Sequence, residues 1–202
     1  EALGRGYRAL VLTNAMKPLH HKKNQLLDLK RRYGDALSLR VSLDHFTPKH
    51  HESIRGADTW SPTMDGLRWL AENEFNFAVA GRTFWDETEE QARRGFEALF
   101  AAESIPVNAD DPSRLVLFPE MDISADVPEI SVNCWDILGV KPESIMCATS
   151  RMVVRRKGAN TPTVVPCTLL PYDPAFELGA ELANSANAVR LNHPHCAKFC
   201  VL

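Results

Sequence analysis

Five cysteines give this chain its clearest chemical potential, and all of them lie in its C-terminal third: Cys134, Cys147, Cys167, Cys196 and Cys200. An odd number of cysteines, with no secretory signal in these residues, disfavours a disulfide framework. Thiols confined to one region favour a metal site instead. His193 and His195 stand beside the last pair in the segment HPHCAKFC and add two further soft ligands.

The residue types leave the identity of the metal open. Four thiolates at one site are typical of zinc or of an iron–sulfur cluster. Structural zinc sites prefer short C-x2-4-C pairs, and only Cys196 and Cys200 come close to such a pair. Dispersed cysteines in a small loop-rich domain suit a [4Fe-4S] cluster at least as well. In a zinc site His193 and His195 would be candidate ligands; otherwise they form a turn that caps the loop.

A second set of polar residues stands at the ends of predicted strands. The segments ALSLRVSLDH and FNFAVAGR alternate apolar with polar or small residues, which places Ser42, Asp44 and Arg82 on polar faces near the strand ends. Asn14 follows an earlier apolar run. Ligands bind at the carboxyl ends of strands in parallel sheets and barrels, so these residues are candidates for a small-molecule site. The alternative is that they cap helices or pair with one another.

The strands that carry these residues alternate with helical patterns up to about residue 118. This alternation of strands and helices predicts parallel βα units, in either an open doubly wound sheet or part of a barrel. One predicted helix begins with Ser61 as N-cap and Pro62 at the first helical position. Beyond residue 122 the pattern changes to a short helix near Cys134, a hairpin flanked by Cys147 and Cys167, and a helix capped by Asp173. We therefore expect domains at 1–122 and 123–202.

Composition narrows the class of partner. The net charge of −3 argues against a nucleic-acid-binding protein. No apolar run approaches the roughly 20 residues of a membrane span, and neither GxGxxG nor a Walker motif occurs. These features predict a cytoplasmic protein without nucleic-acid or membrane partners.

Several segments, in this order, resemble a radical SAM protein with a C-terminal iron–sulfur extension of the SPASM/twitch type: LVLTNAM, RVSLDHFTPKHHESIRG, FAVAGRTFWDETEE, LFPEMD, MCATSRMVVRRKG, CTLLPYD and HPHCAKFCVL. The resemblance implies the later strands of a partial parallel (β/α) barrel over residues 1–122. A small α+β, cysteine-rich extension would follow over 123–202. It also implies an oxidoreductase that cleaves S-adenosylmethionine (SAM) to a 5′-deoxyadenosyl radical, which abstracts hydrogen from a substrate.

The resemblance assigns roles to both sets of residues. Asn14, Ser42, Asp44 and Arg82 would contact SAM. An auxiliary [4Fe-4S] cluster would be held by Cys147, Cys167, Cys196 and Cys200, with Cys134 as an alternative ligand. The implied partners are a small-molecule or peptide substrate and a reductant such as flavodoxin or ferredoxin.

One departure from the family pattern is clear. The CxxxCxxC loop that binds the catalytic cluster is absent, since the first cysteine is Cys134. We therefore expect the chain to be the C-terminal part of a longer enzyme and to be inactive alone. The alternative function is a non-catalytic module that binds zinc or an iron–sulfur cluster.

Overall fold

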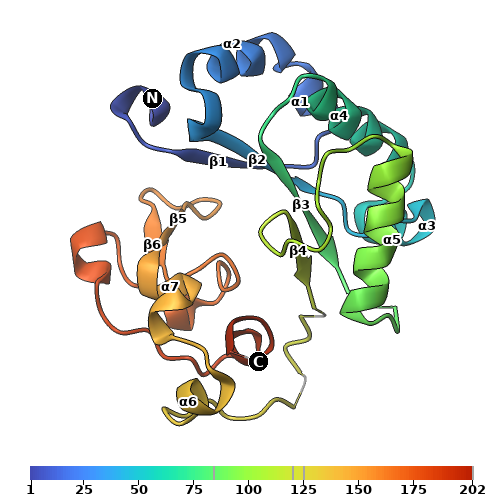
Figure 1. The fold of residues 1–202 in the computed structure, drawn as a ribbon. Coiled ribbons are helices and arrows are strands. Elements are labelled where there is room, and N and C mark those ends of the chain that lie inside the picture. The colour runs from blue at the N-terminus through green and yellow to red at the C-terminus, as the bar shows by residue number, and fades with distance from the viewer. Residues whose placement is uncertain (84, 120, 125, 202) are drawn as a thin grey trace. The chain divides into compact units, whose positions relative to one another are not determined.

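The computed structural model describes residues 1–202 except Phe84, Glu120, Ala125, Leu202 and the side chain of Val201. The chain divides into two compact units, Glu1–Glu120 and Met121–Leu202. Each unit is described by itself below, with the element labels of Figure 1.

The first unit is a mixed α/β structure built on a four-stranded parallel sheet. Its strands are β1 (Ala9–Thr13), β2 (Leu37–Ser42), β3 (Phe77–Arg82) and β4 (Leu115–Phe118). All three neighbouring pairs are parallel, and the strands lie in the order β1-β2-β3-β4. Spatial order thus follows chain order, without the reversal that marks the switch point of a doubly wound sheet.

The helices of this unit lie on one side of the sheet, as Figure 1 shows for α2, α4 and α5. Their bounds are α1 (Lys17–His20), α2 (Lys23–Tyr33), α3 (Pro48–Arg55), α4 (Trp60–Glu72) and α5 (Glu89–Ala102). A right-handed crossover between successive strands always returns on the same side, which accounts for this one-sided cover. No helix among the described residues is both long and apolar enough to cross a bilayer.

Strand β2 separates the two faces of the sheet. Its leucines and valine are buried, whereas Ser38, Arg40 and Ser42 on the other face are half-buried. The buried face joins a core with apolar side chains of α4 and α5: Met64, Leu67, Leu70, Phe96 and Phe100. In register with the polar face, Leu12 of β1 is paired with Arg40 and is 63% exposed. The sheet therefore has one core face and one more accessible face.

The start of α4 differs from the prediction. The helix begins at Trp60, with Thr59 as N-cap, so the prediction of Ser61 as N-cap was wrong. Pro62 lies within the first turn, where N–H groups have no intrahelical partner, so it does not force a later start. Glu52 of α3 accepts a hydrogen bond from the Trp60 N–H (3.2 Å). This acceptor comes from another helix, and its position depends on tertiary packing.

The second unit contains the short helices α6 (Cys134–Leu138) and α7 (Met146–Thr149) and the strands β5 (Met152–Val154) and β6 (Thr163–Val165). The two strands form the expected antiparallel hairpin. The chain ends in a π-helical turn over Cys196–Val201. Short 3-10 turns connect these elements, at Pro142–Ser144, Pro174–Phe176 and Leu182–Ser185.

The helix predicted after Asp173 does not form. Asp173 does accept a hydrogen bond from the Ala175 N–H, but the turn that it caps ends at Phe176. Beyond this turn Val164 of β6 exchanges two backbone hydrogen bonds, accepting from Leu178 and donating to Gly179 (both 2.8 Å). Pairing with β6 keeps this segment extended, a tertiary demand that local helix signals do not reveal.

Gly66 provides a test of how α4 packs on the end of β1. A Cβ at Gly66 would lie 2.0 Å from the carbonyl oxygen of Ala15, which is fully buried. Because backbone cannot move aside as a side chain can, we expect Gly66→Ala to lower the free energy of unfolding by about 1–3 kcal/mol. This loss would occur although alanine has the higher intrinsic helix propensity.

Chemical denaturation measures this difference, with Ser61→Ala at an exposed position of the same helix as the control. The control should change stability by no more than about 0.5 kcal/mol. Equal stability of the two variants would show that α4 does not approach Ala15 as described.

Candidate functional site

The four residues predicted to contact SAM all stand at the carboxyl edge of the sheet. Ser42 and Arg82 are the last residues of β2 and β3, and Asn14 follows the last residue of β1. Ser42 is in register with Ala80 of β3, so the neighbouring strands end close together. Asp44 lies two residues beyond β2. The parallel register thus gathers side chains that are up to 68 positions apart in the sequence.

Asp44 is engaged by two arginines. One carboxylate oxygen accepts from Arg82 Nε (2.7 Å), and the other accepts from Arg55 Nε. The residue is only 2% exposed. Burial by itself raises the pKa of Asp44, but the hydrogen bonds and charges of the two arginines outweigh it, so the pKa lies below the ordinary value of 3.8. Asp44 is therefore an ionised internal counter-ion of Arg55 and Arg82.

The other two residues of this set differ in their surroundings. Asn14 is exposed, and its Oδ1 accepts from the Met16 N–H (3.1 Å) in a local turn. Ser42 is half-buried on the accessible face of the sheet. Of the four, Asp44 and Arg82 are bound to each other in an ion pair, and the contacts of all four with a ligand remain predictions.

Sequence reasoning did not single out the residues that hold Asp44 in place. Arg55 lies 11 positions further along the chain, on α3, and His51 of the same helix accepts a hydrogen bond from the Asp44 N–H through Nδ1 (3.2 Å). His51 is fully buried, and its Nε2 has no hydrogen-bond partner among the described residues. Burial lowers the pKa of His51, which keeps the ring neutral. No spacing rule links residues of a strand end to these positions.

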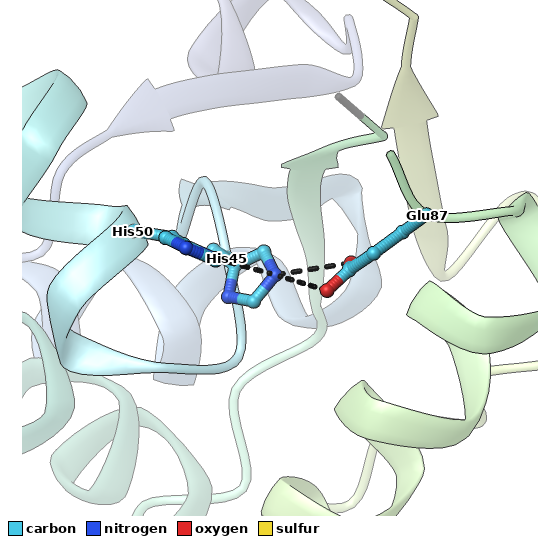
Figure 2. Close-up of side chains that lie close together, drawn as sticks. All are labelled: His45, His50 and Glu87. Carbon is cyan, nitrogen blue, oxygen red and sulfur yellow. Dashed lines mark hydrogen bonds and ion pairs between the residues drawn. The ribbon is translucent and has the colours of Figure 1, made fainter. Parts of the chain in front are cut away.

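A second group at the same edge consists of His45, His50 and Glu87, shown in Figure 2. His45 Nε2 lies 3.1 and 3.2 Å from the two carboxylate oxygens of Glu87 and 3.4 Å from His50 Nδ1. One donor atom from each of the three residues lies within 4.8 Å of the others. Two imidazoles from the segment after β2 and one carboxylate from the segment after β3 thus converge on one point.

The hydrogen bonds of His45 determine its tautomer. The Thr47 N–H donates to His45 Nδ1 (3.0 Å), so Nδ1 carries a lone pair and Nε2 carries the proton that faces Glu87. His45 is 1% exposed. Burial lowers its pKa, although the hydrogen bond and charge of Glu87 act in the opposite direction. The ring is therefore neutral, beside an acceptor-only carboxylate.

Aromatic packing and an unusual backbone hold this group together. The ring of Trp85 stacks on His50, with centroids 4.8 Å apart and planes 3° apart, and meets His45 edge-on at 4.8 Å. Trp85 and Asp86 both have positive φ, 98° and 59°. Non-glycine residues in this conformation cost about 1–3 kcal/mol each, and such residues concentrate at functional sites. Their geometry sets where Glu87 enters the group.

The second unit brings four of the five cysteines to one pocket. Cys147 of α7, Cys167 just beyond β6, and Cys196 and Cys200 of the π-helical turn all line it, together with His195. The rest of its wall is apolar: Pro166, Leu169, Leu170, Val189 and Leu191. The free volume is about 10 Å³, room for about one water, so a larger group would have to displace side-chain atoms.

Cys134 is the first residue of α6. Its sulfur accepts from the N–H of Ser131 (3.4 Å) and lies 4.0 Å from the carbonyl oxygen of Glu129. It is not among the residues that line the cysteine pocket. The four cysteines of the predicted ligand set line the pocket, and the alternative ligand Cys134 is not part of its lining.

The pocket disfavours thiolates when no cation is present. Burial raises the pKa of Cys200 to about 11, and the neighbouring Cys196, Cys167 and Cys147 add to the effect. The pKa values of Cys147 and Cys196 are also raised, mainly by burial. These thiols are therefore protonated at neutral pH, and a bound metal would be needed to hold them as thiolates.

The two histidines near the chain end differ in what they can ligate. His193 Nδ1 accepts from the His195 N–H (3.1 Å). His195 Nε2 lies 3.1 Å from the carbonyl oxygen of Met121. Because a carbonyl oxygen only accepts, Nε2 carries the proton and the lone pair of this ring is on Nδ1. That Nδ1 is buried without a partner among the described residues. Of the two predicted zinc ligands, His195 is therefore the one whose ring lone pair, on Nδ1, accepts no hydrogen bond from the described residues.

The spacing of the thiols bears on the choice of metal. In a tetrahedral zinc–thiolate site with bonds of about 2.3 Å, neighbouring sulfurs are about 3.8 Å apart. Within the described residues, His45, His50 and Glu87 are the group of three donors that meets a spacing of 4.8 Å, and no three of the pocket sulfurs do. The thiols are thus more widely spread than a compact zinc site requires.

Comparison with known proteins does not assign the chain. A scan against protein-family models finds no match, and neither does a search of curated proteins.

The ion pairs of Asp44 give a testable dependence of stability on pH. We expect Asp44→Asn to lower the free energy of unfolding at pH 7 by about 2–3 kcal/mol, since two charged hydrogen bonds are lost at arginines that are themselves about a third exposed. The lowered pKa means that this contribution is complete above the ordinary pKa of 3.8 and lost as the pH falls through the lower, folded-state pKa.

Urea denaturation at a series of pH values measures both effects. The gap between wild type and Asp44→Asn should be constant above about pH 5 and close as the solution becomes more acidic. Asp65→Asn, which removes an exposed i,i+3 pair with Arg68, is the control and should cost less than about 1 kcal/mol. A gap that persists unchanged at pH 2 would contradict the assignment of the ionised carboxylate.

Proposed function

We propose that this chain is part of a radical SAM enzyme whose Met121–Leu202 unit binds an iron–sulfur cluster through Cys147, Cys167, Cys196 and Cys200. One observation carries this proposal: these four cysteines, from three separate segments, line a single pocket. Cys167 and Cys196 also belong to the apolar core cluster of this unit, so the proposal is supported by the convergence of four thiols and not by their burial.

The donor set fits an iron–sulfur cluster in its chemistry. Clusters take four thiolates, and the pocket offers four thiols within an apolar wall that limits contact with water. When bound, such a cluster supplies a centre for electron transfer or for substrate binding. The chain's own contribution is to hold the thiolates and to shield them with Leu169, Leu170 and Leu191. A reducing compartment is part of this proposal, since the thiols must stay unoxidised.

The first unit supports the proposal through its topology. Strands in sequential parallel order with helices on one side are the arrangement of a partial (β/α) barrel, in which the face without helices lines the interior. That face carries Ser38, Arg40 and Ser42. We propose that SAM binds at the carboxyl edge of this face, near Asn14, Ser42, Asp44 and Arg82.

Within this proposal the residues of the edge bind and orient. Ser42 offers a hydroxyl and Asn14 an amide to polar groups of SAM. Asp44 orients Arg82 through their ion pair (2.7 Å). Radical formation and hydrogen abstraction need a catalytic cluster held by a CxxxCxxC loop, which these residues do not contain. The reductant, a flavodoxin or ferredoxin, and the small-molecule or peptide substrate complete the proposed reaction.

The second candidate function is a non-catalytic zinc module. His195 favours it, because its buried Nδ1 has no partner among the described residues and lines the same pocket. The iron–sulfur proposal rests instead on the four thiols that line the pocket. Elemental analysis distinguishes the two, since only a cluster contains inorganic sulfide.

The ligand set gives the decisive test of the cluster. After anaerobic reconstitution with iron, sulfide and zinc all present, we expect the chain to contain iron and sulfide in equal amounts. Serine substitution of Cys147, Cys167, Cys196 or Cys200 should each reduce this content severalfold, because an oxygen ligand replaces a thiolate. Cys134→Ser is the matched control and should retain full content. Zinc without sulfide, or an equal loss in Cys134→Ser, would refute the cluster.

Ser42 gives a separate test of the SAM site. We expect Ser42→Val to weaken SAM binding by the full-length protein about tenfold, the effect of losing one hydrogen bond. Equilibrium dialysis measures the affinity. Ser38→Val, on the same face but at the amino end of β2, is the control and should bind SAM as wild type does. Identical affinities in all three proteins would place the SAM site elsewhere.

A further inference from the structure

We propose that His45, His50 and Glu87 form a second metal site, for a single divalent transition metal, apart from the cysteine pocket. The three side chains reach one point from two segments, after β2 and after β3 (Figure 2). This proposal stands independently of the radical SAM proposal, since it rests on no thiol and on no contact with SAM.

The distances fit a metal coordination shell. With metal–nitrogen bonds of about 2.0–2.1 Å, two ligand nitrogens of a tetrahedral site lie about 3.3–3.4 Å apart. His45 Nε2 and His50 Nδ1 are 3.4 Å apart, and His45 Nε2 is 3.1 Å from the nearer oxygen of Glu87. Both distances are therefore within the range that a shared metal ion gives to its ligand atoms.

The donor types indicate the class of metal. Two imidazoles and one carboxylate bind Zn²⁺ in catalytic sites and Fe²⁺ in oxygenases, with the remaining positions left to water or substrate. Calcium and magnesium, which prefer oxygen ligands, are poor matches. Glu87 supplies the anionic ligand of this set.

Loading the site requires a change of tautomer at His45 and a change of the hydrogen bond that Thr47 makes to it. Its proton now lies on Nε2 and must move to Nδ1, so that Nε2 offers its lone pair to the metal; the ring stays neutral and no proton is lost. Thr47 Oγ1, 2.9 Å from Nδ1, can accept the relocated proton in a hydrogen bond. The Thr47 N–H, which now donates to Nδ1, has to turn away. Thr47 is therefore the outer partner that orients His45.

The surroundings make the site rigid and accessible. Trp85 contacts both histidine rings, and Phe46 stacks on His45 with centroids 4.0 Å apart. The side chain of Glu87 is 22% exposed, which leaves a route for an ion from solvent. The group stands at the carboxyl edge of a parallel sheet, the position where such sheets bind ligands.

Cobalt binding to the metal-free full chain tests the site, because Co²⁺ reports its ligands by absorption and quenches nearby tryptophan. We expect a full equivalent of Co²⁺ without sulfur charge-transfer absorption, in addition to any that the thiols bind. Quenching should be strong in wild type and largely lost in Trp85→Phe, since this ring lies 4.8 Å from both histidines.

Glu87→Gln and His50→Gln remove one ligand each from partly exposed positions and should weaken this equivalent at least about 100-fold, with thiol-bound cobalt unchanged. Thr47→Val should weaken it about 10–100-fold, as expected for an outer partner. The matched controls are Glu97→Gln and His21→Gln, both at exposed positions. Cobalt stoichiometry and quenching that are the same in both ligand variants as in wild type would overturn the proposal, as would binding that only the thiols account for.

Discussion

The pairing of the buried Asp44 carboxylate with two arginines is the interaction that fixes the positions of the elements at the carboxyl edge of the sheet. The two carboxylate oxygens accept hydrogen bonds from Arg55 on α3 and Arg82 on β3. The backbone of Asp44 makes a further hydrogen bond to each of these two elements. The Asp44 N–H donates to His51, and the Asp44 carbonyl accepts from the Arg82 N–H (2.8 Å). Moving α3 or β3 away would leave a buried charge without its partner, which is strongly destabilising. The ion pairs therefore fix these two elements relative to the end of β2.

This anchoring has a consequence for the neighbouring group. Asp44 and Arg55 hold the two ends of the segment that carries His45 and His50, and Arg82 stands five residues before Glu87. The ion pairs therefore help to set the positions from which these side chains converge. A site that is built on loops needs such anchoring, because loops by themselves hold ligand groups less precisely than helices and strands do.

The two units offer chemically different sites. The second unit presents thiols within apolar walls, which suit soft metals and iron–sulfur clusters. The first presents imidazoles and a carboxylate, which suit borderline cations, beside a polar sheet face suited to a small polar molecule. Each unit builds its site from its own residues. Their different donor chemistry would let them discriminate between metals.

Local pattern alone determined several features of this protein. Apolar runs and alternation predicted the four strands, because a strand presents its faces with a period of two wherever it lies. The clustering of the cysteines in one region of the sequence identified them as candidate metal ligands, since the chemistry of a thiol is a property of the residue itself. One helix boundary and one entire helix were predicted wrongly for the opposite reason. Glu52 supplies an acceptor to α4, and β6 pairs with Leu178 and Gly179, so partners distant in sequence decided both.

Only the tertiary structure decided which functional groups meet. It placed four of the five cysteines around one pocket, and it showed that Asp44 is the counter-ion of two arginines. It also revealed His45, His50 and Glu87, which no spacing rule connects because strand register and a strained loop bring them together. Residue type determines what a side chain can do. Which other side chains it acts together with depends on contacts between distant segments, and those contacts arise only when the chain packs.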